Sequence, residues 1–168
     1  THRAQTAEEF ARIASPYVAE RVQIVNHDCD GELIRVGVTS RGTEVDVNPL
    51  VVGRKVILLG GTVHHFFAGY GGGRKSILPG VASRKTIMQN HAHALDPMAA
   101  QPNPLCGLGV TMLNPVHEDM AEAAAMVGPV FGINMIALVD GTPRQLSLRD
   151  ILKDYCDYQR EVIIRRTK

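Results

Sequence analysis

A short apolar run that leads directly into glycines constrains the fold of this chain more than any other feature. Residues 55–59 (Lys-Val-Ile-Leu-Leu) predict one strand, and Gly60-Gly61 follow it without a break. A continuous apolar strand is typical of a sheet that is covered on both faces, usually a parallel one. Open α/β sheets bind ligands in the loops that follow such strands. We therefore predict an α/β fold, a mainly parallel sheet flanked by helices, with a binding site just after this strand.

The other predicted elements are compatible with this fold class. Capping and periodicity indicate helices that begin at Thr6, Ser83, Asn114 and Ser147, the first one limited or kinked by Pro16. Residues 97–114 predict mostly loop. Further strands are expected at residues 23–25, 33–38, 44–47 and 130–139, the second and third forming a hairpin.

Composition restricts the class of protein. The 168 residues suffice for one domain with a core, and a net charge of +1 gives no nucleic-acid or membrane-surface footprint over the chain. Three widely spaced cysteines, Cys29, Cys106 and Cys156, favour a reducing cytosol over a disulfide framework. No apolar run approaches the roughly 20 residues of a membrane span, and there is no signal peptide. A start at Thr1, within a His-Arg motif, predicts a fragment or a processed chain.

The richest chemistry lies in residues 63–80, which contain Gly69, Gly71, Gly72 and Gly73 beside Arg74 and Lys75. A phosphate loop of nucleotide triphosphatases is disfavoured, because Arg74 stands where that motif requires its second glycine. Backbone amides of residues 71–73 beside Arg74 remain candidates for binding a phosphate or carboxylate. A plain glycine turn is the alternative.

Four histidines surround this segment in two close pairs. If the strand continues, His64 and His65 point to opposite faces, so only one of them readily enters a single site. On a helix, His91 and His93 likewise do not share a face. Neither pair supplies the three or four ligands of a zinc site, and the cysteines have no ligand spacing.

Lys75 lies between the glycines and apolar Ile77-Leu78. Desolvation there would lower the pKa of the amine and free it as a nucleophile. The alternative is an ordinary surface lysine.

Residues 65–80, His-Phe-Phe-Ala-Gly-x-x-Gly-Gly-Arg-Lys-x-x-Leu-Pro-Gly, are followed by Thr86-Ile87 and Asn90-His91. This pattern resembles the lactate racemase family that uses a nickel-pincer nucleotide. Matching stretches at residues 1–3, 24–28, 39–43 and 114–116 extend the resemblance over about residues 1–130. The fold is then expected to be part of the racemase N-terminal domain.

The resemblance implies a role for each matching residue. Lys75 would attach the cofactor covalently, and His91 would ligate the nickel. His2 and His65 would be the two catalytic bases, one on each side of the substrate carbon, and histidine suits reversible proton transfer near neutral pH. The cofactor-binding residues are expected to be Lys75, Gly72, Gly73 and Arg74.

The activity implied is a racemase or epimerase of 2-hydroxy acids that works by reversible hydride transfer to the cofactor. That cofactor is nickel with a pyridinium thioamide/thiocarboxylate mononucleotide, and the expected partners are a small 2-hydroxy acid and cofactor-synthesis proteins. The chain lacks the family's preceding substrate-binding segment and its C-terminal domain. An inactive scaffold is therefore an alternative outcome.

Residues 131–168 depart from the racemase pattern. They are similar to the GyrA-type subunit of DNA gyrase and topoisomerase IV, without a motif around that family's catalytic tyrosine. We expect two regions: residues 1–130 for catalysis and cofactor binding, and residues 131–168 as a strand plus helix packed on the same domain. A DNA-associated or interaction module is the alternative function, although the near-neutral charge argues against nucleic acid.

Overall fold

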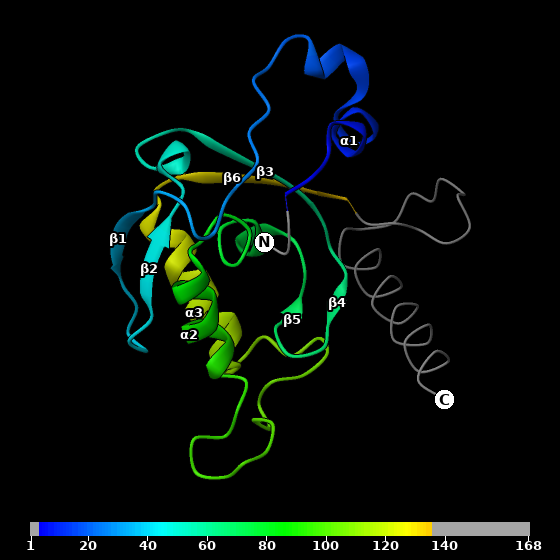
Figure 1. Cartoon of the computed structure of the whole chain (residues 1–168). Helices are drawn as coiled ribbons and strands as arrows, with labels where there is room; N and C mark the ends of the chain where they lie inside the picture. Colours follow the sequence, from blue (N-terminus) through cyan, green and yellow to red (C-terminus); the bar gives the residue numbers. More distant parts are fainter. Residues whose placement is uncertain (1–3, 136–168) are drawn as a thin grey trace, which may run out of the picture.

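The computed structural model describes residues 4–135, which form a small mixed α/β fold (Figure 1). Helices α2 and α3 lie side by side against the β1–β2 hairpin, and β3 and β6 run together at the other side of the molecule. In chain order the elements are α1 (Ala7–Ala19), β1 (Ile34–Val38), β2 (Glu44–Val47), η1 (Pro49–Val51), β3 (Val56–Gly61), β4 (His64–His65), β5 (Gly69–Tyr70), η2 (Gly73–Ser76), α2 (Arg84–Ala92), α3 (Pro115–Met126) and β6 (Val130–Met135).

The described strands form three separate pairs rather than one extended sheet. Strands β3 and β6 are parallel, whereas β1–β2 and β4–β5 are antiparallel. The prediction of a mainly parallel sheet is therefore wrong for residues 4–135. The two antiparallel pairs are closed by short turns, and a short turn can join only antiparallel strands. The strand expected at residues 23–25 is also wrong, since these residues have no regular structure.

Strand β3 lies where the apolar run predicted it, but only one of its faces is packed. Leu58 belongs to the core, whereas Ile57 and Leu59 are 63% and 72% exposed. Their partners in register on β6, Phe131 and Ile133, are exposed as well. The expectation of a sheet covered on both faces is wrong for the described elements, because apolar composition does not reveal how many layers surround a strand.

Local capping signals locate the helices correctly. Thr6 and Glu9 form the predicted capping box at the start of α1, and Ser15 adopts a non-helical φ of 61° just before Pro16. The side chain of Ser83 accepts a hydrogen bond from the amide of Thr86, and that of Asn114 caps α3 in the same way. These caps satisfy amides that a helix leaves unpaired at its first turn. The hairpin and the loop before α3 also follow the prediction.

A buried polar network joins the β1–β2 turn to both central helices. The carboxylate of Asp119 in α3 has no exposed surface and accepts hydrogen bonds from Thr39 at 2.5 Å, Thr43 at 2.9 Å and the amide of Asn90 at 2.8 Å. A buried charge needs such partners to be tolerated. The same turn bonds two more acids of α3, through the pairs Ser40–Glu122 and Arg41–Glu118.

Several sequence predictions fall outside the described residues. These are His2, the part of the strand beyond residue 135, the helix expected from Ser147 and most of the second region at 131–168. None of the helices within residues 4–135 combines the length and the apolar character needed to cross a bilayer.

Candidate functional site

The two imidazoles after β3 are separated by a short hairpin. Strand β4 pairs with β5, with His64 opposite Tyr70 and His65 opposite Gly69. His64 stacks on Tyr70 with a centroid distance of 5.1 Å, whereas His65 contacts Phe66 and Phe67. The predicted division of the pair between two faces is confirmed. Only His65 lines the cavity described next.

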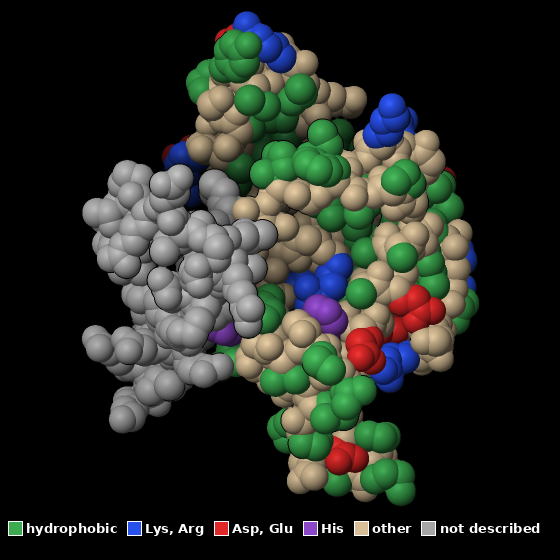
Figure 2. Space-filling model, turned by 180° about the vertical axis from the view of Figure 1, so that it is seen from behind, with side chains coloured by type: hydrophobic (Ala, Val, Ile, Leu, Met, Phe, Trp, Pro, Cys, Tyr) green, Lys and Arg blue, Asp and Glu red, His purple; other side chains and the backbone are tan. Residues whose placement is uncertain are grey.

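A cavity of about 390 Å³ brings together three of the predicted site residues, His65, Lys75 and His91. They come from β4, η2 and α2, so the site depends on how the glycine segment packs on α2. Figure 2 shows a face of the molecule on which histidine and basic side chains meet near the centre. The remaining lining residues are Cys29, Phe66, Phe67, Pro79, Arg84, Ile87 and Met88.

The ring of His65 is held from several sides. Its Nδ1 accepts a hydrogen bond from the backbone N–H of Ala68 at 3.2 Å, and its Nε2 lies 3.4 Å from Nζ of Lys75. Phe66 stacks on the ring at 4.8 Å, and Phe67 meets it edge-on at 4.6 Å. Burial, followed by the charge of Lys75, lowers the pKa of His65 to about 4. The imidazole is therefore neutral at physiological pH.

Lys75 occupies the desolvated position that the sequence predicted. Burial lowers the pKa of its amine to about 8, and the nearby charge of Arg74 acts in the same direction. A free amine is the nucleophilic form, so Lys75 is reactive much closer to neutral pH than an exposed lysine.

His91 completes the group from the last turn of α2. Its ring meets the edge of Phe67 at a centroid distance of 5.0 Å, so Phe67 contacts both His65 and His91. His93, two residues on, lies elsewhere, with its Nε2 3.2 Å from the hydroxyl of Thr43. The prediction that the two histidines would not share a face is confirmed.

The glycines and Arg74 make hydrogen bonds within the loop itself. The amide of Gly73 donates to Oδ1 of Asn134 at 3.0 Å. The guanidinium of Arg74 donates to the carbonyls of Ala68 at 2.7 Å and Tyr70 at 3.3 Å. Gly72 has a φ of 74°, and a Cβ there would lie 2.5 Å from the same Asn134 oxygen. These contacts shape the loop, and binding of the cofactor by Gly72, Gly73 and Arg74 stays a prediction.

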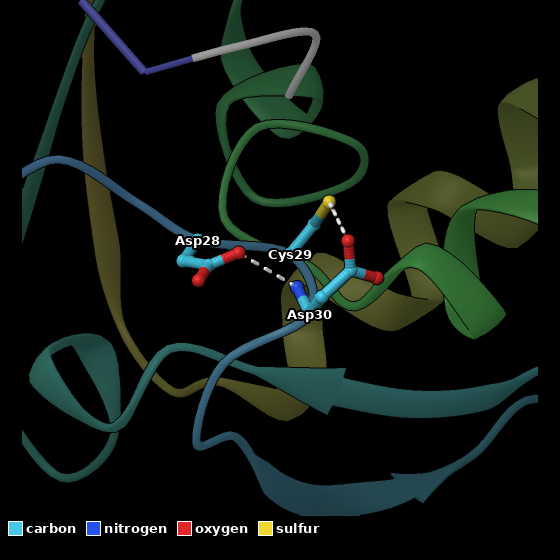
Figure 3. Close-up of side chains that lie close together, drawn as sticks. All are labelled: Asp28, Cys29 and Asp30. Carbon is cyan, nitrogen blue, oxygen red and sulfur yellow. Dashed lines mark hydrogen bonds between the residues drawn. The ribbon is translucent and has the colours of Figure 1, made fainter.

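Within residues 4–135, three metal-binding side chains come close together only at Asp28, Cys29 and Asp30 (Figure 3). Asp30 is already engaged by Arg84 in a bidentate ion pair, with contacts of 2.6 and 2.8 Å, and its backbone N–H donates to Asp28. Neither histidine pair forms such a group. The position of Cys29 at the cavity was not predicted, since no spacing in the chain connects it with the distant glycine segment.

Neighbouring His27 explains how Cys29 reaches the cavity. The imidazole of His27 lies 2.9 Å from the carbonyl of Ala82 through Nε2, and its Nδ1 lies 3.3 Å from the amide nitrogen of Asn48. The amide of Arg84 donates to the carbonyl of Cys29 at 2.9 Å. These bonds fix the irregular segment against the start of α2, where Cys29 and Arg84 both line the cavity.

The fold and the cavity define a mixed α/β domain that holds an amine and two imidazoles ready for a cofactor or metal. The profile of the lactate racemase N-terminal domain matches residues 1–102, and the chain belongs to the lactate racemase family. It is 34% identical over 138 residues to a lactate racemase of Thermoanaerobacterium thermosaccharolyticum and 33% identical over 138 residues to that of Lactiplantibacillus plantarum. Each match covers 80% of this chain and 31% of the relative, so the chain spans about a third of these curated relatives.

Solved structures agree with the family assignment. The lactate racemase apoprotein of T. thermosaccharolyticum matches with a TM-score of 0.70 and 32% identity, over 80% of this chain and 32% of that one. A Thermotoga maritima protein matches in fold, with a TM-score of 0.63 and 20% identity, over 96% of this chain and 44% of the other. Short matches to the GyrA subunit of DNA gyrase also exist, such as 57% identity over 37 residues with the Neisseria gonorrhoeae protein, 22% of this chain and 4% of gyrase.

Proposed function

We propose that this chain supplies the cofactor-holding part of the active site of a racemase or epimerase of 2-hydroxy acids. The observation that carries the proposal is the shared cavity of His65, Lys75 and His91. Family membership supports the reaction class, since two lactate racemases are 34% and 33% identical to the chain. The substrate would be a small 2-hydroxy acid, and cofactor-synthesis proteins would load the site, with the cytoplasm proposed from the cysteines.

The residues fit a nickel-pincer nucleotide in their chemistry. Neutral imidazole nitrogen is a suitable ligand for nickel, and His91 would hold the metal. Lys75 has the lowered pKa that covalent attachment of an acyl group requires. When bound, the cofactor supplies a reversible acceptor for the hydride of the substrate carbon.

The protein's own contribution would be to position the substrate and move its hydroxyl proton. His65, and His2 from the other side, would exchange that proton with the substrate oxygen, since inversion in both directions requires a proton carrier on each face. Phe66 and Phe67 border the cavity and would exclude water from the reacting carbon.

Mass and metal analysis of the protein co-expressed with cofactor-synthesis proteins tests this proposal. We expect an added mass that maps to Lys75, together with bound nickel that is lost in His91→Ala. His93→Ala is the matched control, because its ring contacts Thr43 rather than lining this cavity. Unmodified, nickel-free wild-type protein would overturn the proposal. Racemisation of a panel of 2-hydroxy acids, compared with His65→Ala, then tests catalysis.

The short likeness to gyrase favours one other candidate, a DNA-associated module. It predicts salt-sensitive affinity for duplex DNA, because phosphate contacts release counterions. Flat titrations with duplex DNA at low salt would remove this candidate.

A further inference from the structure

The hydrogen bond from Ala68 determines which nitrogen of His65 carries the proton. A backbone N–H is always a donor, so Nδ1 of His65, 3.2 Å away, must offer its lone pair. In the neutral imidazole the hydrogen then lies on Nε2, an assignment that follows from the hydrogen-bond network. Burial of Ala68 and pairing of Gly69 with His65 across the β4–β5 hairpin hold this contact in place.

The same network determines the role of Lys75. Nε2 of His65 lies 3.4 Å from Nζ of Lys75, and with its hydrogen it is a donor toward that nitrogen. Only the uncharged amine has a lone pair with which to accept, whereas an ammonium would face the N–H with hydrogens of its own. Arg74 and burial disfavour the ammonium as well. The backbone of Lys75 is fixed by bonds to Gly72 and Gly80, so the amine cannot easily withdraw.

We propose that His65 is a positioning residue for the Lys75 amine, holding it uncharged and in place for acylation by an activated acyl group. In that step a C–N bond forms, the leaving group departs with the electrons of its bond to the acyl carbon, and the nitrogen releases one proton to solvent. This role differs from proton exchange with substrate. In the unloaded arrangement His65 is a donor, and exchange with a substrate hydroxyl requires its ring to leave the Ala68 amide. The use of the acylated amine rests on the proposed function.

Trace acetylation of the unloaded chain with acetic anhydride near pH 7.5 tests the proposal. The rate at Lys75 is measured by mass spectrometry relative to exposed Lys55 of the same molecule. We expect His65→Phe to lower the relative rate about tenfold, which is the fall in free amine that a rise of one pKa unit brings. His65→Gln, which keeps an N–H donor near the position of Nε2, should stay within about threefold of wild type if the donor is what matters. An unchanged rate in His65→Phe would overturn the proposal.

A second measurement needs no variant. Nitrogen NMR of the histidine-labelled wild-type chain distinguishes the two neutral tautomers, and we expect His65 to carry its hydrogen on Nε2. A hydrogen on Nδ1 would contradict the inference. Both experiments use neither cofactor nor substrate, so they can succeed in a chain that never takes up nickel, and nickel can bind where they fail.

Discussion

The side-chain amide of Asn90 donates a hydrogen bond to the carboxylate of Asp119 at 2.8 Å, and neither side chain has any exposed surface. The same amide donates to the carbonyl of Val116 at 3.2 Å. Because Asn90 directly precedes His91, these bonds hold the end of α2 that carries His91 against α3. The site therefore depends on a buried polar contact outside the cavity.

Replacing Asn90 with alanine should destabilise the fold and loosen the position of His91. The substitution leaves the buried carboxylate of Asp119 with fewer donors, which typically costs about 1–3 kcal/mol of unfolding free energy. Lys85→Ala on the same helix is the control, since its ion pair with Glu44 is exposed and worth about 1 kcal/mol or less. Urea unfolding of both variants measures the difference. Equal stability of the two variants would show that the buried contact contributes little.

The cluster of the site was predictable because its determinants are local. Glycines, a desolvated lysine and adjacent histidines lie within one short segment, and strand alternation alone separates His64 from His65. Likewise, His91 and His93 are separated by the period of the helix. What placed His65, Lys75 and His91 together was the resemblance to a family, since no periodicity connects β4 with α2.

The contacts that the sequence did not predict join residues far apart in the chain. Thr39 and Asp119 are 80 positions apart, and nothing in either neighbourhood specifies the other as a partner. The same reason explains the error about the sheet: the apolar run of β3 established a strand, but the number of strands and layers around it depends on long-range pairing.

The stability of the folded chain should fall as the pH drops from 6.5 to 4, partly because of His65. Its folded pKa of about 4 lies below the ordinary value of 6.5, so between these values the unfolded chain binds more protons. Stability from this group is complete above pH 6.5 and lost as the pH falls to 4. We expect about 1–2 kcal/mol, after allowing for solvent screening of a half-exposed ring.

Urea unfolding at pH 7 and pH 4.5 measures this contribution as a difference between wild type and His65→Gln. The variant should lose less stability on acidification, since it has no imidazole to protonate at this position. Identical losses would mean that His65 is not desolvated in the folded chain.

Removing the ring of Phe67 should raise the pKa of His65 back toward 6.5. Burial is the main cause of the lowered value, and Phe67 meets the imidazole edge-on at 4.6 Å. NMR titration of the His65 ring protons in Phe67→Ala measures the change. Phe131→Ala is the control, because that ring is exposed on β6 and does not line the cavity. A titration of Phe67→Ala that matches wild type would point to charges rather than burial as the cause.

Gly72→Ala should destabilise the chain more than Gly42→Ala. Both glycines have positive φ, 74° and 84°, so both substitutions carry the backbone strain of about 1–2 kcal/mol that an L-residue meets there. At Gly42 a Cβ has open space, whereas at Gly72 it would lie 2.5 Å from Oδ1 of Asn134 and 2.9 Å from the carbonyl of Gly61. The extra loss in Gly72→Ala therefore measures how closely the loop that carries Lys75 packs on β3 and β6. Thermal unfolding compares the two variants, and acetylation of Lys75 should change only in Gly72→Ala. Equal melting temperatures would show that the loop moves aside at little cost.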